Sequence, residues 1–228
     1  MQFRIGVSLF LGATVLCWAA EETKTAQRLA EATDVVSEIM GAPDKGIPQD
    51  LLDHSQCIVI VPGLKKGAFI VGGKYGKGFA SCRQPKGMGW TGPAAVRVEG
   101  GSVGFQIGGS GSDVVLLVMN QRGMQKLMSS RFTLGAEGEV AAGPVGRDAT
   151  AQTDAFLRAE ILSWSRTRGV FAGLSLTGAT LRQDEDDDKE LYGKRVENKE
   201  ILNASVASPQ SAAKLITVLT KYSPRKTA

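Results

Sequence analysis

Short apolar runs punctuated by glycine dominate the chain from residue 57 to residue 120. Runs such as CIVIVP (57–62), GAFIVGG (67–73) and KGFASC (77–82) have the length and composition of β-strands. Glycine accounts for 28 of the 228 residues, well above its usual share of about 7%, and its scatter among apolar runs indicates tight turns and bulges. Because no helix separates these strands, the pattern predicts a mostly antiparallel sheet that is strongly curved or barrel-like.

Later segments continue the β pattern with alternating or fully apolar runs bounded by turn residues. Two of them read as hairpins, one turning at Gly100-Gly101 and the other at Arg168-Gly169. The predicted strands and hairpins in this part of the chain are 94–109 (hairpin), 112–120, 139–146 and 159–183 (hairpin).

Helical periodicity is strongest at the two ends of the chain. Residues 22–40 place apolar side chains on one face, and Gly41 and Pro43 end the segment. The segment 208–222 begins with Ser-Pro, which suits the first turn of a helix. Shorter helices are predicted at 49–55 and 121–130. The fold class is therefore α+β: a glycine-rich sheet or barrel-like core with N-terminal and C-terminal helices.

The first twenty residues have the features of a secretory signal peptide. Arg4 precedes sixteen uncharged residues, and small residues close the segment before Glu21-Glu22. Cys17 leaves a lipoprotein signal as the alternative, although Leu16 stands where a lipobox has a small residue. We therefore expect residues 21–228 to form one exported, soluble domain in the periplasm or outside the cell. No further apolar run is long enough to span a membrane.

Charge and cysteine content narrow the classes of partner. The formal charge is +4, and it falls to +3 when Arg4 is removed. This mild surplus permits an anionic surface as partner, whereas the absence of a long basic cluster argues against nucleic acid. Cys57 and Cys82 lie at the ends of predicted strands, so they form either a disulfide or two buried thiols.

Three motifs that suggest chemistry fail in their sequence context. GMGWTG (87–92) spells a dinucleotide fingerprint, but no strand precedes it and no helix follows. GGSVG (100–104) resembles a nucleophile elbow, but the only histidine, His54, lies upstream and reads as a polar residue near a helix end. DEDDD (184–188) lacks the later residues of a calcium loop and reads as a solvated acidic loop. We therefore expect no catalytic residues, no metal site and no cofactor.

An ordered set of motifs resembles one known family. The set comprises IPQDLLDHSQCIVIVPGLKKGAFIVGGKYGKG, WTGP, GGSVGFQIGGSGSDVVLLVMNQRGMQKL, AAGPVGRDA, SRTRGVFAGLSLTGATL and LYG, in that order. Together they resemble the SYLF domain family, also called the Ysc84 or Las17-binding actin-regulator family, over roughly residues 30–220. Within that family, the chain resembles the stand-alone exported bacterial members. One departure is that Leu191 precedes Tyr192, where the family usually has two aromatic residues.

The resemblance implies a non-enzymatic lipid-binding module on an anionic phospholipid or phosphoinositide-type surface of the cell envelope. The alternative is a protein–protein interaction module, an actin-regulator-like scaffold with no lipid role. The N-terminal helix offers Lys24 and Arg28 but is net acidic, which does not suit an anionic membrane. The other lipid-binding candidates, flanked by Phe69 and Tyr75, are Lys65, Lys66, Lys74 and Lys77, for which solubilising loop lysines are the competing interpretation.

Other residues of the motifs are predicted to be structural. They are Trp90, Pro93, Asp113, Arg147 and Tyr192. Because a charge beside a fully apolar strand needs a partner, we expect Asp113 and Arg147 to pair with each other or to bind turn backbone.

Overall fold

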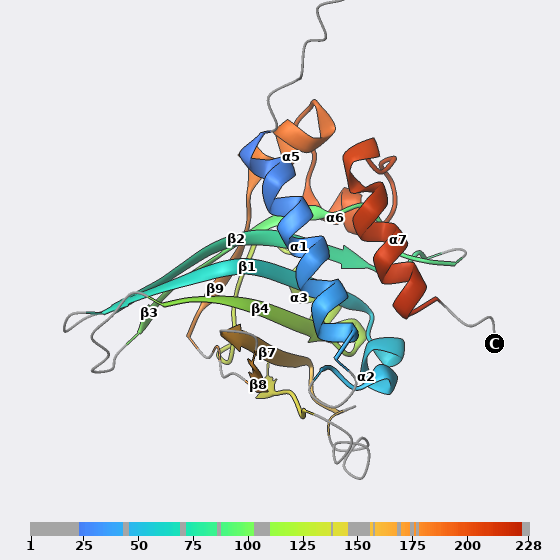
Figure 1. Ribbon diagram of the computed structural model, residues 1–228. Helices are drawn as coiled ribbons and strands as arrows, with labels where there is room; N and C mark the ends of the chain where they lie inside the picture. Colours follow the sequence, from blue (N-terminus) through green and yellow to red (C-terminus); the bar gives the residue numbers. More distant parts are fainter. Residues whose placement is uncertain are drawn as a thin grey trace, which may run out of the picture.

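A strongly twisted sheet forms the body of the protein, and helices cover its two faces toward one end of the strands (Figure 1). This computed structural model describes residues 23–42, 46–68, 72–85, 88–102, 110–137, 139–145, 156, 158–167, 170–173, 176 and 178–224. The predicted signal peptide, residues 1–20, lies outside these ranges.

The N-terminal and C-terminal helices form as the sequence predicts. The N-terminal helix α1 begins after Thr23, whose side chain accepts a hydrogen bond from the Ala26 amide at 3.2 Å, and it ends at Gly41. The helices are α1 (Lys24–Met40), α2 (Gln49–His54), α3 (Gln121–Leu127), α5 (Glu185–Tyr192), α6 (Asn198–Leu202) and α7 (Ala213–Tyr222), with a 3-10 turn η2 (Gln210–Ala212).

Within the part of the chain that the structure describes, nine strands pair in the order β5-β9-β3-β2-β1-β4-β7-β6, with β8 also paired to β7. All pairs are antiparallel except β6 with β7. The strands are β1 (Cys57–Ala68), β2 (Gly72–Cys82), β3 (Ala94–Ser102), β4 (Ser110–Val118), β5 (Arg131–Thr133), β6 (Val140–Ala142), β7 (Ile161–Thr167), β8 (Val170–Gly173) and β9 (Thr180–Gln183). The predicted α+β class, with a curved and mostly antiparallel sheet, is confirmed.

Two predicted strand boundaries were wrong. The predicted strand at 67–73 is divided between two longer strands, because residues 67–68 end β1 and residues 72–73 begin β2; residues 69–71 lie outside the described residues. Gly100 and Gly101 do not form a turn either, because both pair with β2 inside the continuous strand β3. A Gly-Gly pair is typical of a chain reversal, but these two glycines lie within paired strands.

The central strand β1 contains a bulge. Between the pairs Ile60–Phe79 and Lys65–Tyr75, four residues of β1 face three residues of β2. Gly63 lies in the bulge with φ +58°, and its amide donates a 2.9 Å hydrogen bond to the Asp113 carboxylate on β4. The extra residue of the bulge is therefore satisfied by a side chain of the neighbouring strand.

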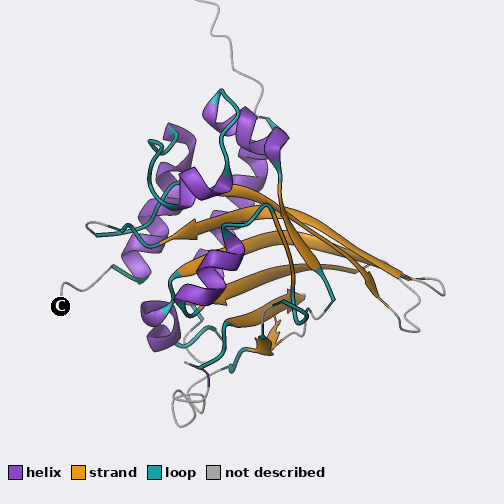
Figure 2. Cartoon of the chain, turned by 180° about the vertical axis from the view of Figure 1, so that it is seen from behind, coloured by secondary structure: helices purple, strands orange, loops and turns teal. Residues whose placement is uncertain are grey.

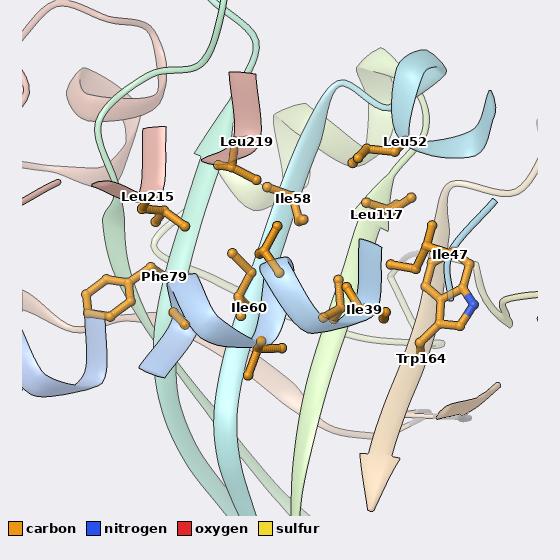
Figure 3. Packing of buried hydrophobic residues seen from close by; sticks show 14 of the residues in the cluster. Ile39, Ile47, Leu52, Ile58, Ile60, Phe79, Leu117, Trp164, Leu215 and Leu219 are labelled. Carbon is orange, nitrogen blue, oxygen red and sulfur yellow. The ribbon is translucent and has the colours of Figure 1, made fainter. Parts of the chain in front are cut away.

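Both faces of the central strands are buried, which explains their continuous apolar sequence. On β1, Ile58 and Ile60 face the layer formed by α1, α2 and α7, while Val59 and Val61 face the layer that contains α3 and α6. Figure 3 shows Ile39 of α1 and Leu215 and Leu219 of α7 among the side chains packed on the first face. Seen from behind, the ends of strands β1–β4 run on past the helices (Figure 2).

We predict that Gly78→Ala will lower the free energy of unfolding by about 3 kcal/mol, measured by urea denaturation. An added Cβ at Gly78 would lie 2.0 Å from the Ile60 carbonyl oxygen and 2.7 Å from the Val61 Cα, both backbone atoms beside the bulge. Gly73→Ala is the matched control, because a Cβ at Gly73 meets nothing within 4 Å. Equal unfolding free energies for the two variants would contradict this account of the bulge.

Candidate functional site

The acidic segment is not a solvated loop, as the sequence suggested, but the helix α5 (Figure 1). Asp184 caps this helix by accepting a 3.3 Å hydrogen bond from the Asp187 amide, and Gly193 ends it with φ +70°. Asp184, Asp187 and Asp188 are buried. Buried carboxylates need ionic or hydrogen-bond partners, and the packing of α5 against α1 and β2 supplies them.

Two of the predicted lipid-binding cations neutralise this acidic cluster. Lys77 Nζ lies 2.7 Å from a carboxylate oxygen of Asp184 and 2.9 Å from one of Asp187, and Arg28 of α1 pairs with Asp187. Burial disfavours the charge on Lys77, but the hydrogen bonds to the two aspartates outweigh that cost and raise its pKa above the usual value. These ion pairs hold α1, β2 and α5 together.

Asp188 is the most deeply buried carboxyl of the cluster. It accepts hydrogen bonds from the Ala95 amide at 2.7 Å and from the Gln183 side chain at 3.2 Å. Burial raises its pKa to about 7, and the charges of Asp184 and Asp187 act in the same direction, whereas the two hydrogen bonds oppose the shift. Asp188 therefore takes up a proton near neutral pH while joining α5 to β3.

We predict that Asp188→Asn will reduce the loss of stability as pH rises from about 5 to about 8. The folded pKa of about 7 lies above the usual value of 3.8, so the protonated form stabilises the fold below about pH 4 and this contribution is lost as pH approaches 7. Asparagine keeps a carbonyl oxygen for the Ala95 amide but cannot ionise.

Melting temperatures at the two pH values test this. The gain of Asp188→Asn over the native chain should be larger at pH 8 than at pH 5, and the exposed Asp186→Asn on the same helix is the control. A constant difference across the pH range would show that Asp188 does not titrate with folding.

Four of the predicted motif residues lie in two separate places. Tyr192 of α5 donates a 3.0 Å hydrogen bond to the Pro93 carbonyl, and burial raises its pKa. Trp90 is buried, and its indole nitrogen donates to the Ser223 carbonyl at 3.1 Å. Gly92 between them has no room for a side chain, because a Cβ would lie 2.6 Å from the Tyr192 hydroxyl oxygen. The WTGP motif thus joins β3 to the helices, while Asp113 lies at the β1 bulge.

Asp113 accepts a hydrogen bond from the backbone, but the amide is that of Gly63 in the bulge of β1 and not that of a turn residue. Besides accepting from Gly63, its carboxylate pairs with Arg166 of β7 at 2.5 Å, and Arg166 also pairs with Glu38 of α1. Arg147, the predicted partner, lies outside the described residues.

The other predicted lipid-binding residues do not form one patch. Lys24 is exposed at the start of α1. Lys65 is exposed and lies opposite Tyr75. Lys74 precedes Tyr75 in β2, so its partly buried side chain points to the other face of the sheet. The backbone of Lys66 pairs with that of Lys74.

Cys57 and Cys82 are cross-strand partners in β1 and β2, and they form a disulfide. Their sequence separation of 25 residues corresponds to about 3.5 kcal/mol of stabilisation in the chain-entropy model. Both cysteines are buried.

Within the described ranges, no three His, Cys, Asp or Glu side chains are placed to hold a metal ion. None of the helices described there is long and apolar enough to cross a bilayer. His54 is exposed at the end of α2, where its Nδ1 lies 2.7 Å from the Asp50 carbonyl oxygen.

Sequence reasoning missed one buried arginine and one group of three arginines. Arg83 is buried, lies over the Trp90 ring at 4.0 Å and donates to the Leu52 carbonyl at 2.9 Å. Arg97, Arg131 and Arg182 come from three strands that pair side by side. Strand alternation in AVRVEG could have shown that Arg97 points away from the face on which Val96 and Val98 are buried. The pairing register that brings the three arginines together cannot be read from the sequence.

Comparisons with known proteins give a consistent result. The family model described as Ysc84, Las17-binding protein actin regulator, matches residues 99–222. An SH3 domain-containing YSC84-like protein 1 of Rattus norvegicus is 29% identical over 90% of this chain and 60% of its own length. An SH3 domain-containing protein of Schizosaccharomyces pombe is 34% identical over 87% of this chain and 46% of its own length.

A third relative is LAS seventeen-binding protein 3 of Saccharomyces cerevisiae, which is 29% identical over 87% of this chain and 43% of its own length. The chain thus spans less than two thirds of these curated relatives, while most of its own length is matched in each.

Proposed function

The chain belongs to the Ysc84 family of Las17-binding protein actin regulators, and from that membership we propose that it is a non-enzymatic protein-interaction module of the actin-regulator type. The observation that carries the proposal is the family match over residues 99–222, together with a relative whose name describes LAS seventeen binding. The ion pairs and hydrogen bonds around α5 join elements of the fold to one another and so have a structural role.

The surface available for such an interaction is the part of the sheet that runs beyond the helices (Figure 1). Tyr75, in this extension, is 48% exposed, and it is one of two large hydrophobic side chains exposed among the described residues. Tyrosine is enriched at protein interfaces, since it combines a large apolar area with a polar end.

We predict that the purified chain will pellet with actin filaments in a high-speed sedimentation assay and stay in the supernatant without them. Tyr75→Ser should weaken this binding about tenfold, because it removes the exposed aromatic ring. Met88→Ser is the control, since Met88 is also exposed, at 62%, but lies outside the sheet. Absence of filament binding by the native chain at all tested concentrations would contradict the actin-regulator assignment.

Anionic lipid is a second candidate, favoured by one observation. Lys65 and Tyr75 are cross-strand partners and both are exposed, so a cation and an aromatic ring share one face of the sheet extension. A cation near an anionic surface contributes about 1 kcal/mol, and an interfacial aromatic ring adds apolar contact. Arg28 and Lys77 contribute less to such binding, because both are paired with buried aspartates.

For this candidate we predict salt-sensitive sedimentation with phosphatidylglycerol vesicles. Lys65→Gln should weaken vesicle binding about fivefold, whereas Lys214→Gln on the exposed side of α7 should leave it unchanged. Binding that is indifferent to both anionic lipid content and salt would remove lipid from consideration.

Export is part of the proposal. The Cys57–Cys82 disulfide supports it, because disulfides form and persist in oxidising compartments such as the periplasm and the extracellular space.

A further inference from the structure

Four basic residues lie in register across four adjacent strands. Lys77 of β2 pairs with Arg97 of β3, Arg97 pairs with Arg182 of β9, and Arg182 pairs with Arg131 of β5. Directly paired residues of an antiparallel sheet point to the same face and are about 5 Å apart. The last three residues, Arg97, Arg182 and Arg131, are called the arginine row below.

The arginine row lies on an accessible face. The side chains of Arg97 and Arg182 are 32% and 42% exposed, and Arg131 is also exposed. Leu181 and Phe132, which alternate with the arginines of β9 and β5, are buried in the core on the opposite face. The arginines therefore point away from that core and toward solvent.

Neutralisation of the arginine row is incomplete. Arg97 and Arg182 share one carboxylate, that of Glu99, at 3.1 and 3.4 Å. Arg131 forms no ion pair with any residue that the structure describes. Lys77, by contrast, is fully engaged by two aspartates. Like charges placed directly opposite one another destabilise a sheet, so the arginine row opposes folding stability.

A cleft of about 430 Å³ runs between the arginine row and the start of α5. Its acidic wall consists of Asp184, Glu185 and Asp186. Asp184 is bound to Lys77, Glu185 lies 3.7 Å from Arg195, and all three acids stand at the positive end of the α5 dipole. The dipole of α5 thus stabilises all three acids, Lys77 and Arg195 stabilise two of them, and the guanidinium groups of the opposite wall remain available.

We propose that the arginine row is the docking site for an acidic segment of a partner protein, which rests on the proposed function as a protein-interaction module. Guanidinium groups bind carboxylates in a planar, bidentate geometry. Glutamates three and four positions apart on a helix are 5–6 Å apart, which matches the spacing between neighbouring strands. An acidic helix lying across β3, β9 and β5 would place one carboxylate on each arginine.

The test uses a fluorescent alanine-based peptide of about 20 residues with glutamates at i, i+4 and i+7. Fluorescence anisotropy with the full chain should show binding that weakens between about 0.05 M and about 0.5 M salt. Arg182→Gln and Arg131→Gln should each weaken binding about tenfold. Arg158→Gln should leave binding unchanged, because Arg158 is an exposed arginine just before β7, toward the opposite edge of the sheet from β9 and β5.

Stability separates a docking role from a structural one. Arg182→Gln should melt at the same or a higher temperature than the native chain at low salt, because it relieves repulsion from both neighbours. A marked fall in melting temperature would show that the arginine row supports the fold, and it would overturn the proposal.

Three further results would also overturn the docking proposal. The first is failure of the native chain to bind the peptide, and the second is equally tight binding of a peptide of the same composition with scattered glutamates. The third is that Arg158→Gln weakens peptide binding as much as Arg182→Gln does. Loss of phosphatidylglycerol vesicle binding in Arg182→Gln, without any peptide binding, would assign the arginine row to a membrane instead. If the chain pellets with actin filaments but fails to bind the peptide, the docking assignment fails while the proposed function stands.

Discussion

The bulge in β1 is the constraint on which the rest of the sheet depends. β1 is a central strand, paired with β2 on one side and β4 on the other, and the extra residue shifts its register against both. Gly78 lets the backbones approach at this point, and Asp113 accepts the hydrogen bond of Gly63 that the ladder leaves unpaired. Because Asp113 also binds Arg166 of β7, the bulge is coupled to the next strand of the sheet.

The acidic helix α5 provides the second tie, between the sheet and the helical layer. Its buried aspartates hold Arg28 of α1, Lys77 of β2 and the Ala95 amide of β3. Removing one partner of a buried ion pair leaves an uncompensated charge, so these contacts are sensitive to substitution and to pH. Two of the cations that the sequence suggested for lipid binding, Arg28 and Lys77, therefore stabilise the fold instead.

The arginine row differs from these contacts because its ion pairs, those of Arg97 and Arg182 with Glu99, lie within and between the paired strands β3 and β9, and neither of them reaches a helix. Three guanidinium groups lie on neighbouring strands, and only those of Arg97 and Arg182 share the carboxylate of Glu99, so electrostatic repulsion persists within the folded chain. A surface that opposes stability in this way is expected at functional sites. It fits a family of protein-binding regulators, and it directs attention to acidic segments of the partner rather than to a catalytic centre.

The sequence by itself determined the α+β class, the helices at both ends and the paired strands of the core, because apolar periodicity and helix-ending residues are local properties. It also pointed to Trp90, Pro93 and Tyr192, and to Cys57 with Cys82. Only the tertiary structure decided that Gly100 and Gly101 continue a strand and that residues 184–188 are partly buried. The arginine row likewise depends on strand register, and register arises from long-range packing that a linear sequence does not display.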